Sequence, residues 1–127
     1  GGKIIGKTVN SFASLSLSPP LVLFSLDKKA SSLNNFKKSK YLSINFLTIN
    51  QKNISQNFSR KNSDWNNTEF FFSNFKTPII KNCLSNLECI KTKLIPMGDH
   101  IIFVCKVINI SSVNNVKPLI YYNSKYI

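Results

Sequence analysis

The segment from Thr8 to Phe24 constrains the fold of this 127-residue chain more than any other segment. Apolar residues stand between Ser, Thr and Asn residues from Val9 to Leu17, a pattern typical of a β-strand. Pro19 and Pro20 follow, and because they remove two backbone donors, no helix continues through them. The apolar run 21–24 then indicates a buried strand. The segment therefore predicts a strand that enters a loop of small polar groups, followed by a second strand.

The hydroxyl-rich part of this segment, residues 8–20, admits two interpretations. Its five hydroxyls, one carboxamide and free backbone N–H groups suit a polyhydroxylated, phosphorylated ligand without any large charged residue. Ser and Asn in loops also commonly bond to their own backbone, and the segment is then ordinary surface. The chemistry of the segment alone leaves both interpretations open.

The length and composition indicate one domain with an adequate core, since 43% of the residues are hydrophobic. No run of eighteen apolar residues predicts a transmembrane helix, and we expect no membrane partner. The chain begins Gly1-Gly2 without Met, and residues 6–8 interrupt any apolar stretch of a signal peptide. We therefore expect a processed chain or a fragment.

The net charge of +12 comes from 17 basic and 5 acidic residues and favours an anionic partner, such as nucleic acid, a phosphorylated cofactor or a membrane surface. However, Arg60 is the only arginine. The abundance of Lys, Asn, Ile, Phe and Ser is typical of proteins encoded by A+T-rich genes. Because Arg is the preferred reader of bases and phosphates, we do not expect a nucleic acid as the partner.

The three cysteines, Cys83, Cys89 and Cys105, have neither CxxC nor zinc-site spacing. Each lies in an apolar, strand-like context, which predicts buried thiols in a reducing compartment, the cytoplasm. The single histidine, His100, adds too few ligands for a metal site, so none is predicted.

Hydrophobic periodicity predicts a mainly-β fold with short helices. Strands are expected at 3–11, 21–26, 41–47, 84–95, 100–110 and 117–122, helices at 31–38 and 50–61, a loop at 61–68 and a turn at 97–99. The Phe triplet at 70–72 is either a strand or a buried turn. Many strands without a βαβ rhythm predict an antiparallel barrel with appended helices.

The predicted helix at 31–38 offers a candidate phosphate site. Ser31 or Ser32 is a plausible N-cap, and unpaired N–H groups at a helix start attract phosphate. Simple capping is the alternative. Elsewhere no nucleophile–base arrangement and no Gly-rich phosphate loop occurs, so no residue is predicted to be catalytic. If the protein is an enzyme, a cofactor supplies the chemistry.

Four motifs in register give the chain a resemblance to the short-chain flavin reductase family. Residues 8–16, followed by Pro-Pro-Leu-Val at 19–22, resemble its signature strand and loop. The later landmarks are Ile44-Asn45-Phe46-Leu47 with Gln51 and Phe58, Leu87-Glu88-Cys89 followed by Gly98-Asp99-His100 and Phe103-Val104, and Pro118-Leu119-Ile120-Tyr121-Tyr122 with Tyr126. The resemblance covers nearly the whole chain.

The resemblance implies an antiparallel split β-barrel of the FMN-binding type over residues 1–127, usually a homodimer. Such proteins use NADH or NADPH to reduce FMN or FAD by hydride transfer to flavin N5, and many supply reduced flavin to a partner monooxygenase. A non-catalytic flavin-binding or electron-transfer protein on the same barrel is an alternative. A basic β-barrel that binds nucleic acid through Tyr41, Phe46 and Tyr121 is another.

The resemblance also implies roles for individual residues. The flavin ring and ribityl chain would contact Thr8, Asn10, Ser11, Phe12 and Ser14, with Ser25 and Leu26 beside them. Ser31 and Ser32 would hold the phosphate near Lys28 or Lys29, and Phe58 to Arg60 would close over it. The nicotinamide nucleotide would meet His100, assisted by Tyr126.

Two departures from the family pattern concern the ends of the chain. The helix and first strand that family members carry before the position of Gly1 are missing, so we expect an N-terminal truncation that leaves an unpaired strand edge. Ser124 stands where the family often has Gly, and we expect this residue to stiffen or shift the tail.

Overall fold

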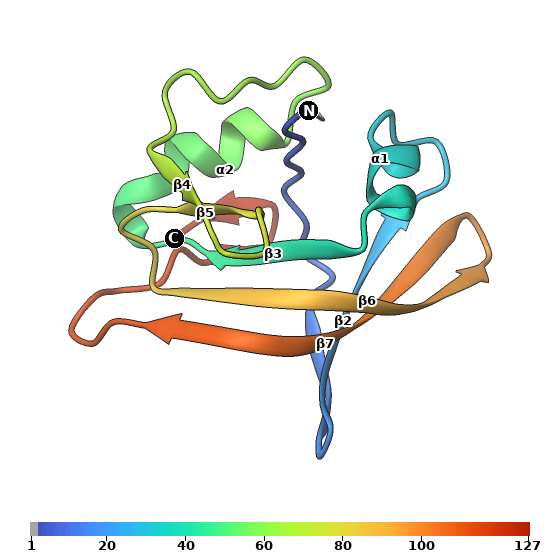
Figure 1. Cartoon of the computed structure of the whole chain (residues 1–127). Coiled ribbons are helices and arrows are strands. Elements are labelled where there is room, and N and C mark those ends of the chain that lie inside the picture. The colour runs from blue at the N-terminus through green and yellow to red at the C-terminus, as the bar shows by residue number, and fades with distance from the viewer. Residues whose placement is uncertain (1–2) are drawn as a thin grey trace.

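A five-stranded antiparallel sheet dominates the computed structural model, which describes residues 3–127 (Figure 1). Its strands lie in the order β1-β2-β7-β6-β3, so β1 and β3 form the two edges. The elements are β1 (Ala13–Leu17), β2 (Pro20–Asp27), α1 (Leu33–Lys38), β3 (Tyr41–Phe46), η1 (Ile49–Gln51), α2 (Lys52–Phe58), β4 (Phe70–Phe72), β5 (Pro78–Ile80), β6 (Ser85–Met97), β7 (His100–Ser112), β8 (Tyr121–Tyr122) and β9 (Lys125–Tyr126). Gly1 and Gly2, with which the expected processed chain or fragment begins, lie outside the described residues.

The long hairpin β6–β7 forms the centre of the sheet (Figure 1). Both strands are rich in β-branched and aromatic residues, which favour extended backbone. Gly98 makes the turn between them with a φ of 60°, in the left-handed region that glycine enters without steric cost. The predicted turn at 97–99 and the two flanking strands are thereby confirmed.

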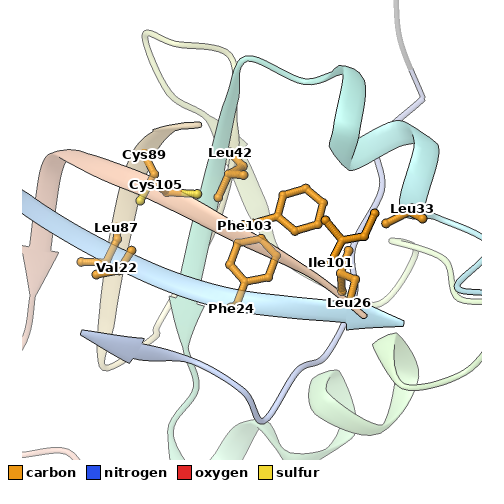
Figure 2. Close-up of a cluster of buried hydrophobic side chains, with 10 residues drawn as sticks. All are labelled: Val22, Phe24, Leu26, Leu33, Leu42, Leu87, Cys89, Ile101, Phe103 and Cys105. Atoms are coloured by element: carbon orange, nitrogen blue, oxygen red, sulfur yellow. The ribbon is translucent and has the colours of Figure 1, made fainter. Parts of the chain in front are cut away.

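The hydrophobic core lies on one face of this sheet (Figure 2). Alternate residues of β2, namely Val22, Phe24 and Leu26, are buried there, as the period of two requires. Phe24 lies opposite Phe103 of β7, and their rings stack with centroids 5.0 Å apart and planes 6° apart. The other members are Leu33, Leu42, Leu87, Cys89, Ile101 and Cys105.

The predicted strand at 3–11 is wrong. Residues 3–12 are in neither helix nor strand, and β1 begins only at Ala13. The loop therefore precedes the strand instead of following it. Hydrogen bonds from Thr8 and Ser11 to backbone groups of α2 and β2 hold the segment in place, as described below, instead of a neighbouring strand. The prolines act as predicted, since the chain turns between Leu17 and Pro20 and returns as β2.

The C-terminal strand predicted at 117–122 is also wrong. Pro118 makes only an isolated bridge to Thr48, and the chain then forms the small hairpin β8–β9. Asn123 and Ser124 form its turn, both with positive φ (52° and 61°). Glycine adopts such backbone without strain, so Ser124 holds a conformation to which Gly is better suited.

The helices are shorter than predicted. The 50–61 helix is a 3-10 turn, η1, followed by α2, and the 31–38 helix is the six-residue α1. Ser32 occupies the N-cap of α1, but its side chain makes no capping hydrogen bond. The Phe triplet at 70–72 is a strand, β4, and the predicted loop at 61–68 has neither helix nor strand.

Polar side chains attach the outer elements to the sheet. The ammonium of Lys91 on β6 donates to the carbonyls of Phe36 and Lys37 at the end of α1. On β6 the buried carboxylate of Glu88 accepts from the Thr77 hydroxyl at 3.3 Å and from the Asn109 amide at 2.8 Å. These bonds fix α1 and the segment leading into β5 against the sheet. A buried carboxylate is tolerable because both oxygens are bonded.

No helix within residues 3–127 has the length and apolarity needed to cross a membrane. The same residues contain no group of three or more His, Cys, Asp or Glu side chains placed to hold a metal ion.

All three cysteines are buried free thiols, as predicted. Burial raises the pKa from 9.0 to about 11 for Cys83 and Cys105 and to about 12 for Cys89. Because the pKa of each thiol is higher in the folded state, the thiols of the unfolded chain ionise first as the pH rises. The stability that the buried thiols contribute is therefore fully present below pH 9 and is lost as the pH rises from 9 toward 11.

We therefore expect the native thiols to react slowly with Ellman's reagent at pH 8 and immediately in guanidinium chloride. Urea unfolding should show little change in stability between pH 8 and 9, and between pH 9 and 10.5 a fall that approaches about 1.4 kcal/mol per pH unit for each thiol. A Cys89→Ala variant should lose part of this dependence. Rapid labelling of the native protein would contradict the prediction.

Candidate active site

A cleft of about 1330 Å³ lies between the segment at residues 3–12, strand β3 and helix α2. Sites for drug-sized ligands usually measure about 300–1,000 Å³, so this cleft is large enough for a dinucleotide or two stacked ligands. The predicted site residues that line it are Thr8, Asn10, Ser11, Phe12, Ser25, Leu26, Phe58, Arg60, His100 and Tyr126. Tertiary structure thus brings together residues from both ends of the chain.

Thr8 fastens the N-terminal segment to α2. Its hydroxyl donates to the carbonyl of Ser55 at 2.7 Å, and its N–H donates to the carbonyl of Phe58 at 3.0 Å. At Gly6 the segment lies so close to α2 that an added Cβ would be 2.8 Å from the Phe58 ring. The absence of a side chain at this position is therefore a condition for this wall of the cleft.

Ser11 fastens the same segment to β2. Its Oγ accepts from the N–H of Ser25 at 2.9 Å, and its hydroxyl is 3.2 Å from the carbonyl of Ser25. Nearby, the ring of Phe12 meets Phe46 edge-on at 4.8 Å. Ser11 and Phe12 thus hold the wall in place, and Asn10, between them and Thr8, is a further polar residue that lines the cleft.

Ser55 joins α2 to the C-terminal hairpin. This residue is 5% exposed, and its hydroxyl lies 2.8 Å from the Tyr126 hydroxyl. The ammonium of Lys52 lies over the Tyr126 ring, 5.4 Å from its centroid, in a cation–π contact. The hairpin β8–β9 therefore closes one end of the cleft, and the contact of Tyr126 with Ser55 holds it there.

His100 stands at the other end of the cleft, beside Asp27 on the neighbouring strand β2. Its Nδ1 lies 2.7 Å from the carboxylate of Asp99, and this hydrogen bond lowers the pKa of Asp99. With Nδ1 as the donor to Asp99, Nε2 remains available to a ligand. The imidazole is 44% exposed, so an incoming molecule reaches it from solvent.

Three predicted site residues do not line the cleft. Ser14 is exposed on β1, and Ser31 and Ser32 lie before α1. Because α1 has only six residues and Ser32 makes no capping bond, the start of this helix is not shown to be a phosphate site. In Figure 1, α1 and α2 lie on opposite sides of the descending N-terminal segment.

Several residues that line the cleft were not predicted: Lys7, Ser43, Asn45, Lys52, Trp65 and Lys125. Trp65 packs against Phe58 with ring centroids 4.7 Å apart and against Phe70 at 4.8 Å, so it folds back and closes over α2. No local pattern in the sequence indicates these residues. They belong to loops or to strand positions whose neighbours are fixed only by the fold.

The aromatic residues that a nucleic-acid site would require do not share one surface. Phe46 packs against Phe12 inside the cleft, whereas Tyr41 contacts Phe75 between β4 and β5 at 5.0 Å. Tyr121 packs against Tyr126 on the C-terminal hairpin.

The fold and the cleft define a mainly-β protein of the split-barrel class, with a large cleft lined by small polar, aromatic and cationic residues. The chain belongs to the flavin reductase like domain family, whose model matches residues 1–127.

Known proteins similar to the chain include two bacterial reductases. It is 34% identical over 98% of its length to the reductase component of the flavin-dependent trigonelline monooxygenase of Acinetobacter baylyi. It is 36% identical over 82% of its length to the FMN reductase (NADH) SmoA of Agrobacterium fabrum. The chain spans 40% and 60% of the lengths of these two relatives, respectively.

Solved structures show the same fold. The NADH:FAD oxidoreductase SgcE6 of Streptomyces globisporus, in complex with NAD and FAD fragments, superposes with a TM-score of 0.94 at 27% identity. The match covers 100% of this chain and 79% of that one. The mainly-β split-barrel fold predicted from the sequence is confirmed.

Proposed function

We propose that this protein is an NAD(P)H-dependent flavin reductase. The observation that supports it most is that one cleft joins the Thr8–Phe12 wall, His100 and Tyr126, which the family resemblance assigns to flavin and nicotinamide. A bound FMN or FAD would accept a hydride at N5 from the nicotinamide. This chemistry needs no protein nucleophile, in accord with the scarcity of catalytic side chains.

The residues of this chain would bind and orient the two rings. The wall at residues 8–12 is held in place by Thr8 and Ser11. Because this segment belongs to no sheet, its backbone groups and Asn10 could hydrogen-bond to the polar edge of a flavin. His100 would direct Nε2 toward the nicotinamide nucleotide while Asp99 fixes its ring. By holding the two rings close together and oriented, these residues would supply the proximity on which hydride transfer depends.

The proposal extends to a homodimer in the cytoplasm that supplies reduced flavin to a monooxygenase. The monooxygenase partner is supported by the Acinetobacter relative, which is the reductase component of a flavin-dependent monooxygenase. A second copy is supported by β7, since its part beyond Lys106 has no β2 partner within residues 3–127 and exposes Ile108 and Ile110. The free thiols support the cytoplasm. Light scattering on a sizing column measures the mass in solution.

The decisive experiment follows absorbance at 340 nm after FMN is added to the purified protein with NADH or NADPH. We expect oxidation of the dinucleotide, and His100→Ala should raise its KM about tenfold with a smaller change in kcat, because a uniform binding contact is lost. His100→Gln, which retains a polar group, is the matched control and should lose less.

Firm flavin binding without any oxidation of NADH or NADPH would reject the reductase. It would favour a flavin-binding or electron-transfer protein on the same barrel, reduced by a protein donor. An unchanged KM in His100→Ala would remove the nicotinamide role of this residue.

A further inference from the structure

A second cavity, of about 620 Å³, shares a single lining residue, Ile54, with the cleft described above. Its walls come from η1 and the first turns of α2, from the two segments next to the β4–β5 hairpin, and from the loop that follows β7. Small-molecule sites usually measure about 300–1,000 Å³, so this second cavity is large enough for a ligand of its own.

Hydrogen bonds to η1 hold the walls of the second cavity together. The side chain of Gln51, which is 8% exposed, donates from Nε2 to the carbonyl of Lys81 at 2.8 Å and accepts from the N–H of Thr48 at 3.0 Å. The N–H of Ile49 donates to the carbonyl of Lys117 at 2.9 Å. Because this one turn binds both of the other walls, the cavity is formed before any ligand enters.

Charges of both signs line the second cavity without pairing with one another. Glu69 and Lys81 are bonded through their backbones, since the N–H of Lys81 donates to the carbonyl of Glu69 at 2.9 Å, and Lys117 is the third charged residue of the lining. Within residues 3–127 the one ion pair is His100–Asp99, so neither lysine ammonium pairs with the Glu69 carboxylate. These three charges are therefore available to a ligand.

Four asparagines add uncommitted carboxamides to this lining: Asn50, Asn67, Asn82 and Asn115. Among the polar lining residues, Thr48 and Gln51 are the two whose side chains hydrogen-bond within residues 3–127. Each asparagine side chain therefore keeps both a donor and an acceptor for a ligand.

The pattern of charge selects among classes of small ligand. A simple anion would pair with the two lysines and leave the Glu69 carboxylate unpaired, and a simple cation would meet two like charges. A molecule that carries both a carboxylate and an ammonium group pairs with both signs through charge-assisted hydrogen bonds. Amino acids carry these two groups on one carbon atom, and a polar side chain would add hydrogen bonds to the carboxamides.

We propose that the second cavity is a binding site for a polar amino acid. Lys81 and Lys117 would bind its carboxylate, Glu69 would bind its ammonium group, and the carboxamides would bind its side chain. The inference goes beyond the proposed reductase function, because the residues that the resemblance assigns to flavin and nicotinamide line the other cavity. It holds or fails without any measurement of NADH or NADPH oxidation.

An NMR titration of the isotope-labelled protein with three probes tests this proposal. L-Glutamine carries both charges and a carboxamide, N-acetyl-L-glutamine lacks the ammonium group, and L-glutamine amide lacks the carboxylate. The amide signals of Asn67, Asn82 and Asn115 report on the second cavity, whereas those of Asn10 and Asn45 report on the cleft. The experiment therefore shows both whether a probe binds and where it binds.

We expect L-glutamine to shift the signals of the second cavity with a Kd of about 1 mM or below, and each derivative to bind about tenfold more weakly. Glu69→Gln should weaken L-glutamine about tenfold and leave N-acetyl-L-glutamine unchanged, because this derivative lacks the ammonium group that Glu69 would bind. Lys81→Gln/Lys117→Gln should weaken L-glutamine and leave L-glutamine amide unchanged. Lys106→Gln is the matched control, because Lys106 is exposed on β7 and lines neither cavity.

The proposal is overturned if L-glutamine at about 10 mM shifts no signal of the second cavity, or shifts only those of the cleft. It is also overturned if either derivative binds as tightly as L-glutamine, because the site then does not require both charges. Equal affinities of L-glutamine for Glu69→Gln and Lys106→Gln would remove the role assigned to Glu69, and the proposal with it.

Discussion

Replacing Phe103 by alanine is expected to lower the free energy of unfolding by about 3–5 kcal/mol. Phe103 has no exposed surface, and it stacks on Phe24 across β2 and β7 at the centre of the core (Figure 2). The substitution removes the ring and leaves a cavity that the two paired strands cannot collapse to fill. Since small domains are stable by about 5–15 kcal/mol, this loss is a large share of the total.

Urea unfolding followed by circular dichroism measures this change. Phe71→Ala is the matched control, because Phe71 is 51% exposed on β4 and should cost about 1 kcal/mol or less. Phe103→Leu retains most of the volume and should cost about 1–1.5 kcal/mol, so it gives a readable transition even if the alanine variant does not fold. Equal losses for Phe103→Ala and Phe71→Ala would contradict the position assigned to the core.

Gly6→Ala is expected to destabilise the protein by about 1–3 kcal/mol and to weaken FMN binding about tenfold or more. An added Cβ would lie 2.8 Å from Cδ1 and Cε1 of Phe58 and 3.1 Å from Cζ2 of Trp65. The Phe58 ring is buried and packed against Trp65, so it has no free space to enter. The segment must therefore move away from α2, and it carries Thr8 and Asn10 with it.

A double-mutant cycle identifies the clash as the cause. Phe58→Leu makes room beside residue 6, so Gly6→Ala should cost less in that background than in the wild type. Gly98→Asn is the control: nothing lies within 4 Å of an added Cβ there, and Asn tolerates the positive φ. If Gly6→Ala costs the same in both backgrounds, contact with Phe58 is not what excludes a side chain.

Patterns local to the sequence predicted most of the sheet. The strands β2, β3, β6 and β7 could be predicted because the spacing of apolar residues along a strand indicates which of its faces are buried. This spacing can be read from each strand by itself. The resemblance to flavin reductases added the family and an ordered set of site residues. Most of these residues prove to lie in one cleft.

Other elements depend on contacts that no local pattern contains. Residues 3–11 have the alternation of a strand but form none, because Thr8 and Ser11 bind the segment to α2 and β2 instead of to a strand partner. The C-terminal hairpin is held by two contacts to residues distant in sequence: the bridge of Pro118 to Thr48 and the hydrogen bond of Tyr126 to Ser55.

The sequence by itself thus determined that the chain is a mainly-β member of a flavin reductase family, with the core strands and the polar wall at residues 8–12 in place. Only the tertiary structure decided that Ser31 and Ser32 lie outside the cleft and that Lys7, Lys52 and Lys125 line it. The physical reason is that the period of burial along a strand is encoded residue by residue, whereas the meeting of residues from both ends of the chain depends on their hydrogen bonds to α2.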